Sequence, residues 1–156
     1  MTCTDKPITY MEWILERSHF HPDMEPTRQS DLFKWYANLS TLIIADEPNE
    51  VGVCIAEPWK RFEIQVESFE SHDLTEWIIS SDEICLPINR ERKPDGSRSS
   101  HLTIPPNIMY PVPAGLWHHP AFYIKDTDKS VLIMVIRSTK IDTKQHPLPE
   151  PITILT

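Results

Sequence analysis

The fold is decided by the stretch Pro113-Ala-Gly-Leu-Trp-His-His-Pro120, considered together with the earlier stretch Phe69-Glu-Ser-His-Asp-Leu-Thr-Glu76. On a strand, residues i and i+2 point to the same face, so Glu70 and His72 are expected to project together. Glu76 is expected to return to that face after a short irregular step. In the later stretch a Pro-x-Gly turn precedes a strand, which on regular alternation presents either His118 or His119 inward but not both. The spacing therefore predicts that these side chains converge.

Neutral imidazole combined with carboxylate oxygens and open positions is a ligand set that holds a divalent first-row metal ion. The sequence thus predicts a metal site made of Glu70, His72, Glu76 and His118, with nickel, zinc, manganese or iron as the ion. The alternative is a hydrogen-bonded cluster inside a barrel without metal, because buried ionisable groups need partners in either case.

Short β-type runs separated by turn residues fill the chain after about residue 40. The 15 prolines against three glycines also indicate many short elements, because proline is excluded from helix interiors and central strand positions. About nine strands are expected, which favours a barrel or sandwich in one domain spanning residues 1–156. The runs are Thr41–Ala45, Val51–Ala56, Phe62–Ser68, Trp77–Ser80, Glu83–Ile88, His101–Ile104, Ala121–Lys125, Val131–Arg137 and Ile152–Leu155.

Apolar spacing predicts one short N-terminal helix from Pro7 to about Arg17 and a second helical or irregular stretch over Asp31–Leu39. Asn89–Asn107 is expected to be mostly a solvated hairpin loop. Thr139–Pro151, with its three prolines, is expected to be an extended connection before the last strand.

Composition excludes several classes of function. The 15 Lys and Arg against 23 Asp and Glu give a net charge of −8, so no nucleic acid partner is expected. The longest apolar run, Val131–Ile136, is far shorter than the roughly 20 residues of a membrane span, so no membrane association is expected. A secretory signal is not evident at the start, which predicts a cytoplasmic protein. Cys3, Cys54 and Cys85 form no CxxC pair, and they are interpreted as buried or idle thiols.

The pattern Glu70-x-His72-x-x-x-Glu76 followed by Pro113-x-Gly115-x-x-His118 resembles the two sequence motifs of the cupin superfamily. The first motif there usually begins with His-x-His, so Glu70 stands in place of a histidine, and the usual flanking glycines are absent. The resemblance implies a cupin-type double-stranded β-helix, which is a mainly β jelly-roll barrel. Such barrels commonly pair through an edge strand, so a homodimer is also implied.

The chain more closely resembles the ureidoglycolate lyase family of cupin-like proteins, whose segments Met-Glu-Arg-His-Pro and Gly-Val-Trp-His-His-Pro correspond to 69–73 and 115–120 here. The likeness runs over most of residues 28–138. Gly52-Val-Cys-Ile-Ala-Glu-Pro58 resembles that family's early strand, and Leu132 to Arg137 resembles its late strand. At Pro111-Val112 and Glu76-Trp77 the sequence departs from the family.

The resemblance implies a lyase that splits ureidoglycolate, a carbinolamide, into glyoxylate and urea. A metal held by Glu70, His72 and His118 would stabilise the substrate oxygen and lower its hydroxyl pKa. Glu76 is then either the remaining ligand or a general base, and His119 is the candidate proton donor. The substrate carboxylate is expected to bind a guanidinium group through two parallel hydrogen bonds, and Arg137 is the first candidate for this role and Arg61 the second.

Two alternatives remain open at this point. Glu76 has no counterpart in the lyase family, and this favours a metal cupin with another reaction, such as oxygenation or isomerisation of a sugar or keto acid. A cupin that binds a small molecule without catalysis is expected instead if Glu70 and Glu76 both turn outward.

Overall fold

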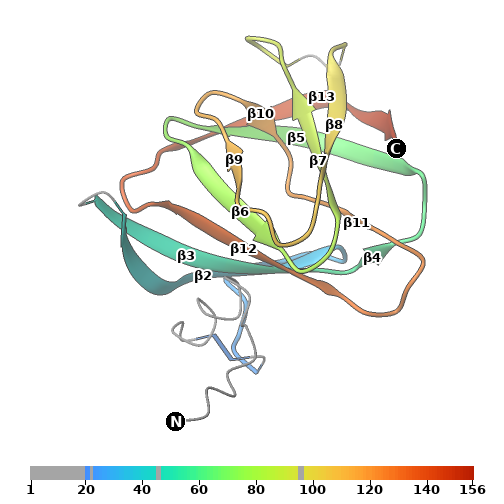
Figure 1. Ribbon diagram of the computed structural model, residues 1–156. Coiled ribbons are helices and arrows are strands. Elements are labelled where there is room, and N and C mark those ends of the chain that lie inside the picture. The colour runs from blue at the N-terminus through green and yellow to red at the C-terminus, as the bar shows by residue number, and fades with distance from the viewer. Residues whose placement is uncertain (1–19, 22, 45–46, 95–96) are drawn as a thin grey trace.

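The computed structural model describes residues 20–21, 23–44, 47–94 and 97–156, and within them all regular structure is β-strand (Figure 1). The expected helix Pro7–Arg17 lies outside these residues, as does Cys3. The strands are β1 (Arg28–Gln29), β2 (Phe33–Ile44), β3 (Glu47–Ala56), β4 (Pro58–Trp59), β5 (Glu63–His72), β6 (Glu76–Ser80), β7 (Ile84–Asn89), β8 (Ser99–Ile104), β9 (Tyr110–Val112), β10 (Trp117–His118), β11 (Tyr123–Ile124), β12 (Val131–Ser138) and β13 (Thr143–Leu155).

Two sheets face each other (Figure 1). One has the strand order β1-β2-β3-β12-β6-β9, the other has β13-β5-β10-β7-β8, and β4 pairs with β11 in a small parallel ribbon. All pairings within the two large sheets are antiparallel, and neighbours in each sheet come from distant parts of the chain. This is a jelly-roll sandwich, so the expected mainly β fold is confirmed.

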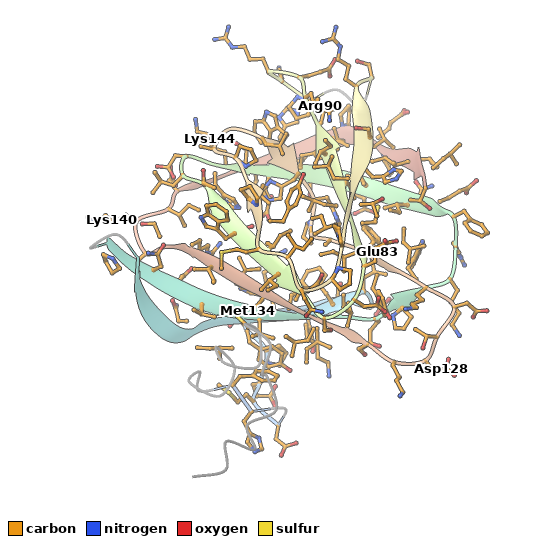
Figure 2. The ribbon with its side chains drawn as sticks, viewed as in Figure 1. Glu83, Arg90, Asp128, Met134, Lys140 and Lys144 are labelled. Carbon is orange, nitrogen blue, oxygen red and sulfur yellow. The ribbon has the colours of Figure 1, made fainter. Side chains whose placement is uncertain are left out.

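The largest apolar cluster is made of inward side chains from both sheets, including Ile78 and Ile133 from the first sheet and Leu86 and Ile104 from the second. Figure 2 shows side chains filling the space between the sheets, while Arg90 lies outside it at the end of β7 and Asp128 lies in the loop before β12. The core therefore supports the inner faces of both sheets, and the candidate site is built on those faces.

Two segments differ from the sequence-based expectation. Asp31–Leu39 was expected to be helical or irregular, but from Phe33 onward it belongs to β2, which pairs with β3. Helical spacing of its aromatic residues was misleading, because on the strand Phe33 and Trp35 point to one face and Tyr36 is buried on the other. Asn38, at φ 53°, marks the register shift between Tyr36 and Ser40.

The second difference concerns Thr139–Pro151, which was expected to be a connection. From Thr143 it is part of β13, which pairs with β5 on both sides of a register shift between Pro147 and Ile152. Because β13 is an edge strand, prolines are tolerated where their missing N–H groups face away from the sheet. Likewise, β8 begins at Ser99, inside the expected loop.

Cys54 and Cys85 are buried free thiols, as expected, and burial raises the pKa of each to about 12. In the described part of the chain, a helix with the length and apolar character needed to cross a membrane is not found.

Candidate metal centre

Glu70 and His72 lie at the end of β5, beside His118 on the neighbouring strand β10, and Glu76 begins β6 in the facing sheet. His118 pairs directly with Glu70 across these strands. Gly115 precedes β10 with φ +80°, a conformation that L side chains rarely adopt, and its N–H donates to the His72 carbonyl at 2.8 Å. The Pro-x-Gly turn thus places the start of β10 against the end of β5.

Four candidate ligands converge between the sheets. Glu70, His72 and His118 each offer one ligand atom, and these atoms all lie within 4.8 Å of one another. The Nε2 atom of His72 is 3.5 Å from a Glu76 carboxylate oxygen. The Nε2 atom of His118 is 3.8 Å from Glu70 and 3.9 Å from Glu76. The structure therefore brings together all four residues that the sequence predicted as ligands.

His72 and His118 both direct their Nε2 atoms toward the carboxylates of Glu70 and Glu76. His118 donates its Nδ1–H to the Leu116 carbonyl at 3.0 Å, so the neutral ring carries its lone pair on Nε2. The Nδ1 atom of His72 is hydrogen-bonded to the Thr143 hydroxyl at 2.9 Å. Among the described residues, both buried Nε2 atoms have no hydrogen-bond partner. Buried polar atoms are rarely left unpaired, so the two Nε2 atoms are candidate metal-binding atoms.

Burial dominates the electrostatics of the group. It lowers the pKa of His72 to about 4, with the adjacent His118 adding to the effect. Burial also raises the pKa of Glu76 to about 7, although nearby Arg137 acts in the opposite direction. Glu70 is less buried, and one of its oxygens accepts a hydrogen bond of 2.9 Å from the Gln145 side chain on β13.

Arg137, at the end of β12, lies beside the group with one terminal nitrogen 3.9 Å from Glu76. Its Nε donates to the Glu50 carboxylate, and its guanidinium lies 5.6 Å from the Trp35 ring centroid. Trp35 in turn packs on Gly52, where any Cβ would overlap the indole. Arg61, the second candidate, is exposed near Trp59 and does not line the cavity.

Glu70, Glu76, His118 and Arg137 line a cavity of about 440 Å³, whereas the His72 side chain is not among its lining residues. It also contacts residues that the sequence did not single out, chiefly on β1, β2 and β13, because only the three-dimensional pairing brings those strands here. The lining residues are Thr27, Arg28, Phe33, Trp35, Ala37, Cys54, Glu70, Glu76, Ile78, Leu86, Val112, His118, His119, Pro120, Ala121, Ile133, Val135, Arg137, Thr143 and Gln145.

His119 lines the cavity together with His118, contrary to the expectation that only one of them would face inward. The strand alternation does not apply because β10 ends at His118. His119 donates its Nδ1–H to the Pro120 carbonyl at 2.9 Å and stacks on Phe122, and burial lowers its pKa. Its neutral ring therefore carries the free lone pair on Nε2.

Several solved structures share this arrangement of strands. Vicilin from Corylus avellana (hazelnut) matches 76% of this chain with a TM-score of 0.52 and 9% sequence identity. A mutant of Bacillus subtilis oxalate decarboxylase matches 81% with a TM-score of 0.52 and 15% identity. The chain has the cupin fold. The matched cupin region makes up only 33% and 30% of those two chains, so the likeness concerns the fold alone.

A further structure of the Bacillus subtilis oxalate decarboxylase, described for its Mn(II) centres, matches 81% of this chain and 30% of its own, at a TM-score of 0.50 and 14% identity. No protein-family model matches the sequence, and no curated protein matches it. The ureidoglycolate lyase resemblance therefore rests on the quoted residues.

Proposed function

We propose that this cupin is a metal-dependent lyase that cleaves ureidoglycolate, or a similar small carboxylate-bearing carbinolamide, to glyoxylate and urea or the corresponding amide. The observation that carries the metal part is the pair of buried, unpartnered Nε2 atoms of His72 and His118 that face two carboxylates. The Trp117-His118-His119-Pro120 match to the lyase family supports the reaction type.

The donor set fits a divalent first-row ion. Ligands about 2.1 Å from one ion lie about 3.0 Å apart when adjacent and about 4.2 Å apart when opposite. The separations of 3.5 to 3.9 Å between imidazole and carboxylate atoms fall within that interval. The charge of Arg137 is shared by Glu50 and Glu76, and a divalent ion would add positive charge beside the carboxylates of Glu70 and Glu76.

Glu70, His72 and His118 would hold the ion, with Glu76 as the fourth ligand or as a base beside it. When bound, it would supply Lewis acidity at the substrate hydroxyl oxygen, where negative charge develops as the C–N bond breaks. The apolar side chains in the cavity lining would strengthen such electrostatic stabilisation.

Arg137 would orient the substrate carboxylate. Glu50 and the Trp35 ring already fix the guanidinium, so little conformational freedom is lost when it binds an anion. His119 is neutral, and its Nε2 is free to accept the hydroxyl proton before returning it to the departing nitrogen. This order of events refines the simple donor role expected from the sequence.

The test is product formation by purified protein. The protein is stripped with a chelator, reloaded separately with manganese, zinc, nickel or iron(II), and supplied with ureidoglycolate. Glyoxylate and urea should appear in equal amounts above the spontaneous rate. His72→Ala should lose bound metal and product together, whereas His101→Ala, on β8 outside the cavity lining, should keep both. No product above the spontaneous rate with any of the four metals contradicts the proposal.

A second candidate is a metal cupin with another reaction, such as oxygenation or isomerisation of a sugar or keto acid. The buried position of Glu76 next to His72 favours it, because the lyase family has no carboxylate there. Oxygen uptake with the iron-loaded protein and a candidate substrate distinguishes it from the lyase. A purely binding cupin is favoured less, because Glu70 and Glu76 face the imidazoles rather than solvent.

A further inference from the structure

The cavity changes character along its strands. On β12 the residues that line it are Arg137, Val135 and Ile133, and on β6 they are Glu76 and Ile78. Each step of two residues keeps the side chain on the same face and advances about 6.7 Å. The cavity therefore runs from a charged end at the candidate metal centre to an apolar end about 13 Å away along β12.

The apolar end is a built wall and not a solvent-exposed margin. Five of its side chains are 8% exposed or less, and both sheets contribute to it: Cys54, Ile78, Leu86, Ile133 and Val135. The Cys54 thiol, with its pKa of about 12, stays uncharged. Phe33, Trp35 and Ala121 extend this wall with half-buried apolar surface.

Ureidoglycolate uses only part of this space. A cavity of about 440 Å³ lies in the range of pockets that hold larger organic ligands, about 300–1,000 Å³. With its carboxylate at Arg137, the molecule would direct its ureido group toward Ile78 and Val135. Amide N–H groups buried against such side chains lose their water hydrogen bonds without compensation. An apolar group in the same place gains from burial.

From this we infer that the preferred substrate is an N-acyl-α-hydroxyglycine with an apolar acyl group, aromatic or branched aliphatic. The inference rests on the proposed lyase function and names its substrate class. In the reaction the C–N bond breaks and its electron pair goes to nitrogen. The hydroxyl loses its proton and becomes the aldehyde of glyoxylate, while the nitrogen gains a proton and leaves as a primary amide. Neither oxidant nor water is consumed.

The kinetic experiment compares α-hydroxyhippurate with ureidoglycolate on the metal-loaded protein. The two substrates share the carbinolamide and the carboxylate, and differ by a phenyl ring in place of an amino group. We expect kcat/KM to be at least about tenfold higher for α-hydroxyhippurate, which corresponds to burial of one aromatic ring. Equal or faster cleavage of ureidoglycolate overturns this inference and leaves the lyase function standing.

The binding experiment separates recognition from catalysis. Hippurate and N-carbamoylglycine lack the hydroxyl and do not react, so calorimetry on the metal-loaded protein measures affinity alone. Hippurate should bind at least about tenfold more tightly. Val135→Thr, which adds a hydroxyl to the apolar wall, should reduce that preference several-fold, and Leu132→Thr on the opposite face of β12 should not. Equal affinities overturn the inference, whereas absence of glyoxylate from both substrates overturns the lyase function instead.

Discussion

Arg137 is the residue on which recognition of the substrate anion depends in the proposed reaction. It contacts Glu50, lies near Glu76 and stacks on Trp35, so its fork of donors is fixed in place. Arg137→Lys retains the charge but loses the planar fork, and kcat/KM should fall about tenfold or more. Arg61→Lys is the matched control, because Arg61 lies outside the cavity, and it should change kcat/KM little. Equal effects of the two variants would contradict the role of Arg137.

Glu76 and His72 oppose each other in the pH dependence of the metal-free protein. The pKa of His72 is lowered from 6.5 to about 4, so its contribution to folding stability is lost as the pH falls from about 6.5 to 4. The pKa of Glu76 is raised from 4.5 to about 7, so its contribution is lost as the pH rises from about 4.5 to 7. Between about pH 4.5 and 6.5, the opposite contributions of His72 and Glu76 to the free energy of unfolding partly cancel.

Glu76→Gln should therefore expose the dependence on His72. Urea unfolding of the chelator-treated variant should give a free energy of unfolding that decreases more steeply between pH 6.5 and 4.5 than that of the wild type. The reason is that the opposing contribution of Glu76 has been removed. A slope unchanged from that of the wild type would mean that Glu76 is ionised throughout this interval.

At the residue scale, the sequence predicted the ligands but not their surroundings. Glu70, His72 and His118 could be found because strand alternation and a turn motif fix their directions locally. Trp35 and Arg28 could not, because their contacts with the cavity depend on the pairing of β1, β2 and β3.

At the scale of elements, β13 supports the candidate metal centre from the edge of its sheet. Thr143 pairs with His72 and Gln145 pairs with Glu70 in the β5–β13 register, and each side chain is hydrogen-bonded to the ligand opposite it. Such partners fix the orientation of metal ligands. An edge strand thus contributes one hydrogen-bond partner for each candidate ligand on β5.

Thr143→Val should weaken metal affinity by about 10- to 100-fold, because the His72 ring loses the hydroxyl that holds it. Competition with a chromogenic chelator measures this directly, without reference to activity. Lys144→Ala is the matched control, since Lys144 lies between Thr143 and Gln145 and does not line the cavity (Figure 2). If both variants bind metal as the wild type does, β13 has no positioning role.

The strands β5, β6, β7 and β12 could be predicted from their apolar runs, whereas β2 and β13 could not be predicted in full. In β2 the aromatic residues also fit a helical spacing, and only pairing with β3 decides between the two. In β13 the prolines indicated a connection, because their tolerance depends on the strand being at a sheet edge. Position within the sheet is a property of the assembled fold and is not encoded in the segment itself.

At the scale of the whole molecule, the candidate metal centre links three separate strands, β5, β6 and β10, across the two sheets. Binding of an ion to the folded state alone should therefore raise the melting temperature. At a free metal concentration 100 times its Kd, the increase should be about 5–10 °C for a domain of this size. Scanning calorimetry with and without a chelator measures it. His72→Ala should show no such increase, and a wild-type protein that shows none would argue against a resident metal.

The barrel or sandwich was predictable from the short β-type runs, and the jelly roll was expected because residues 69–76 and 113–120 resemble the two cupin motifs. The charged and apolar ends of the cavity could not be predicted, because they depend on which side chains of β3, β6 and β12 share a face in the folded sheet. The comparison with vicilin and oxalate decarboxylase supports the fold alone. The proposed chemistry is argued from the side chains that line the cavity.

Trp35 provides a built-in optical probe of the cavity. Its indole rests on the bare backbone of Gly52 and lies beneath the Arg137 guanidinium, with one side lining the cavity. An indole in such a place changes its emission when nearby water is displaced or when the neighbouring cation moves. Replacing the other tryptophans by phenylalanine would isolate the Trp35 emission. Fluorescence would then report occupancy of the cavity in real time, even with compounds that do not react.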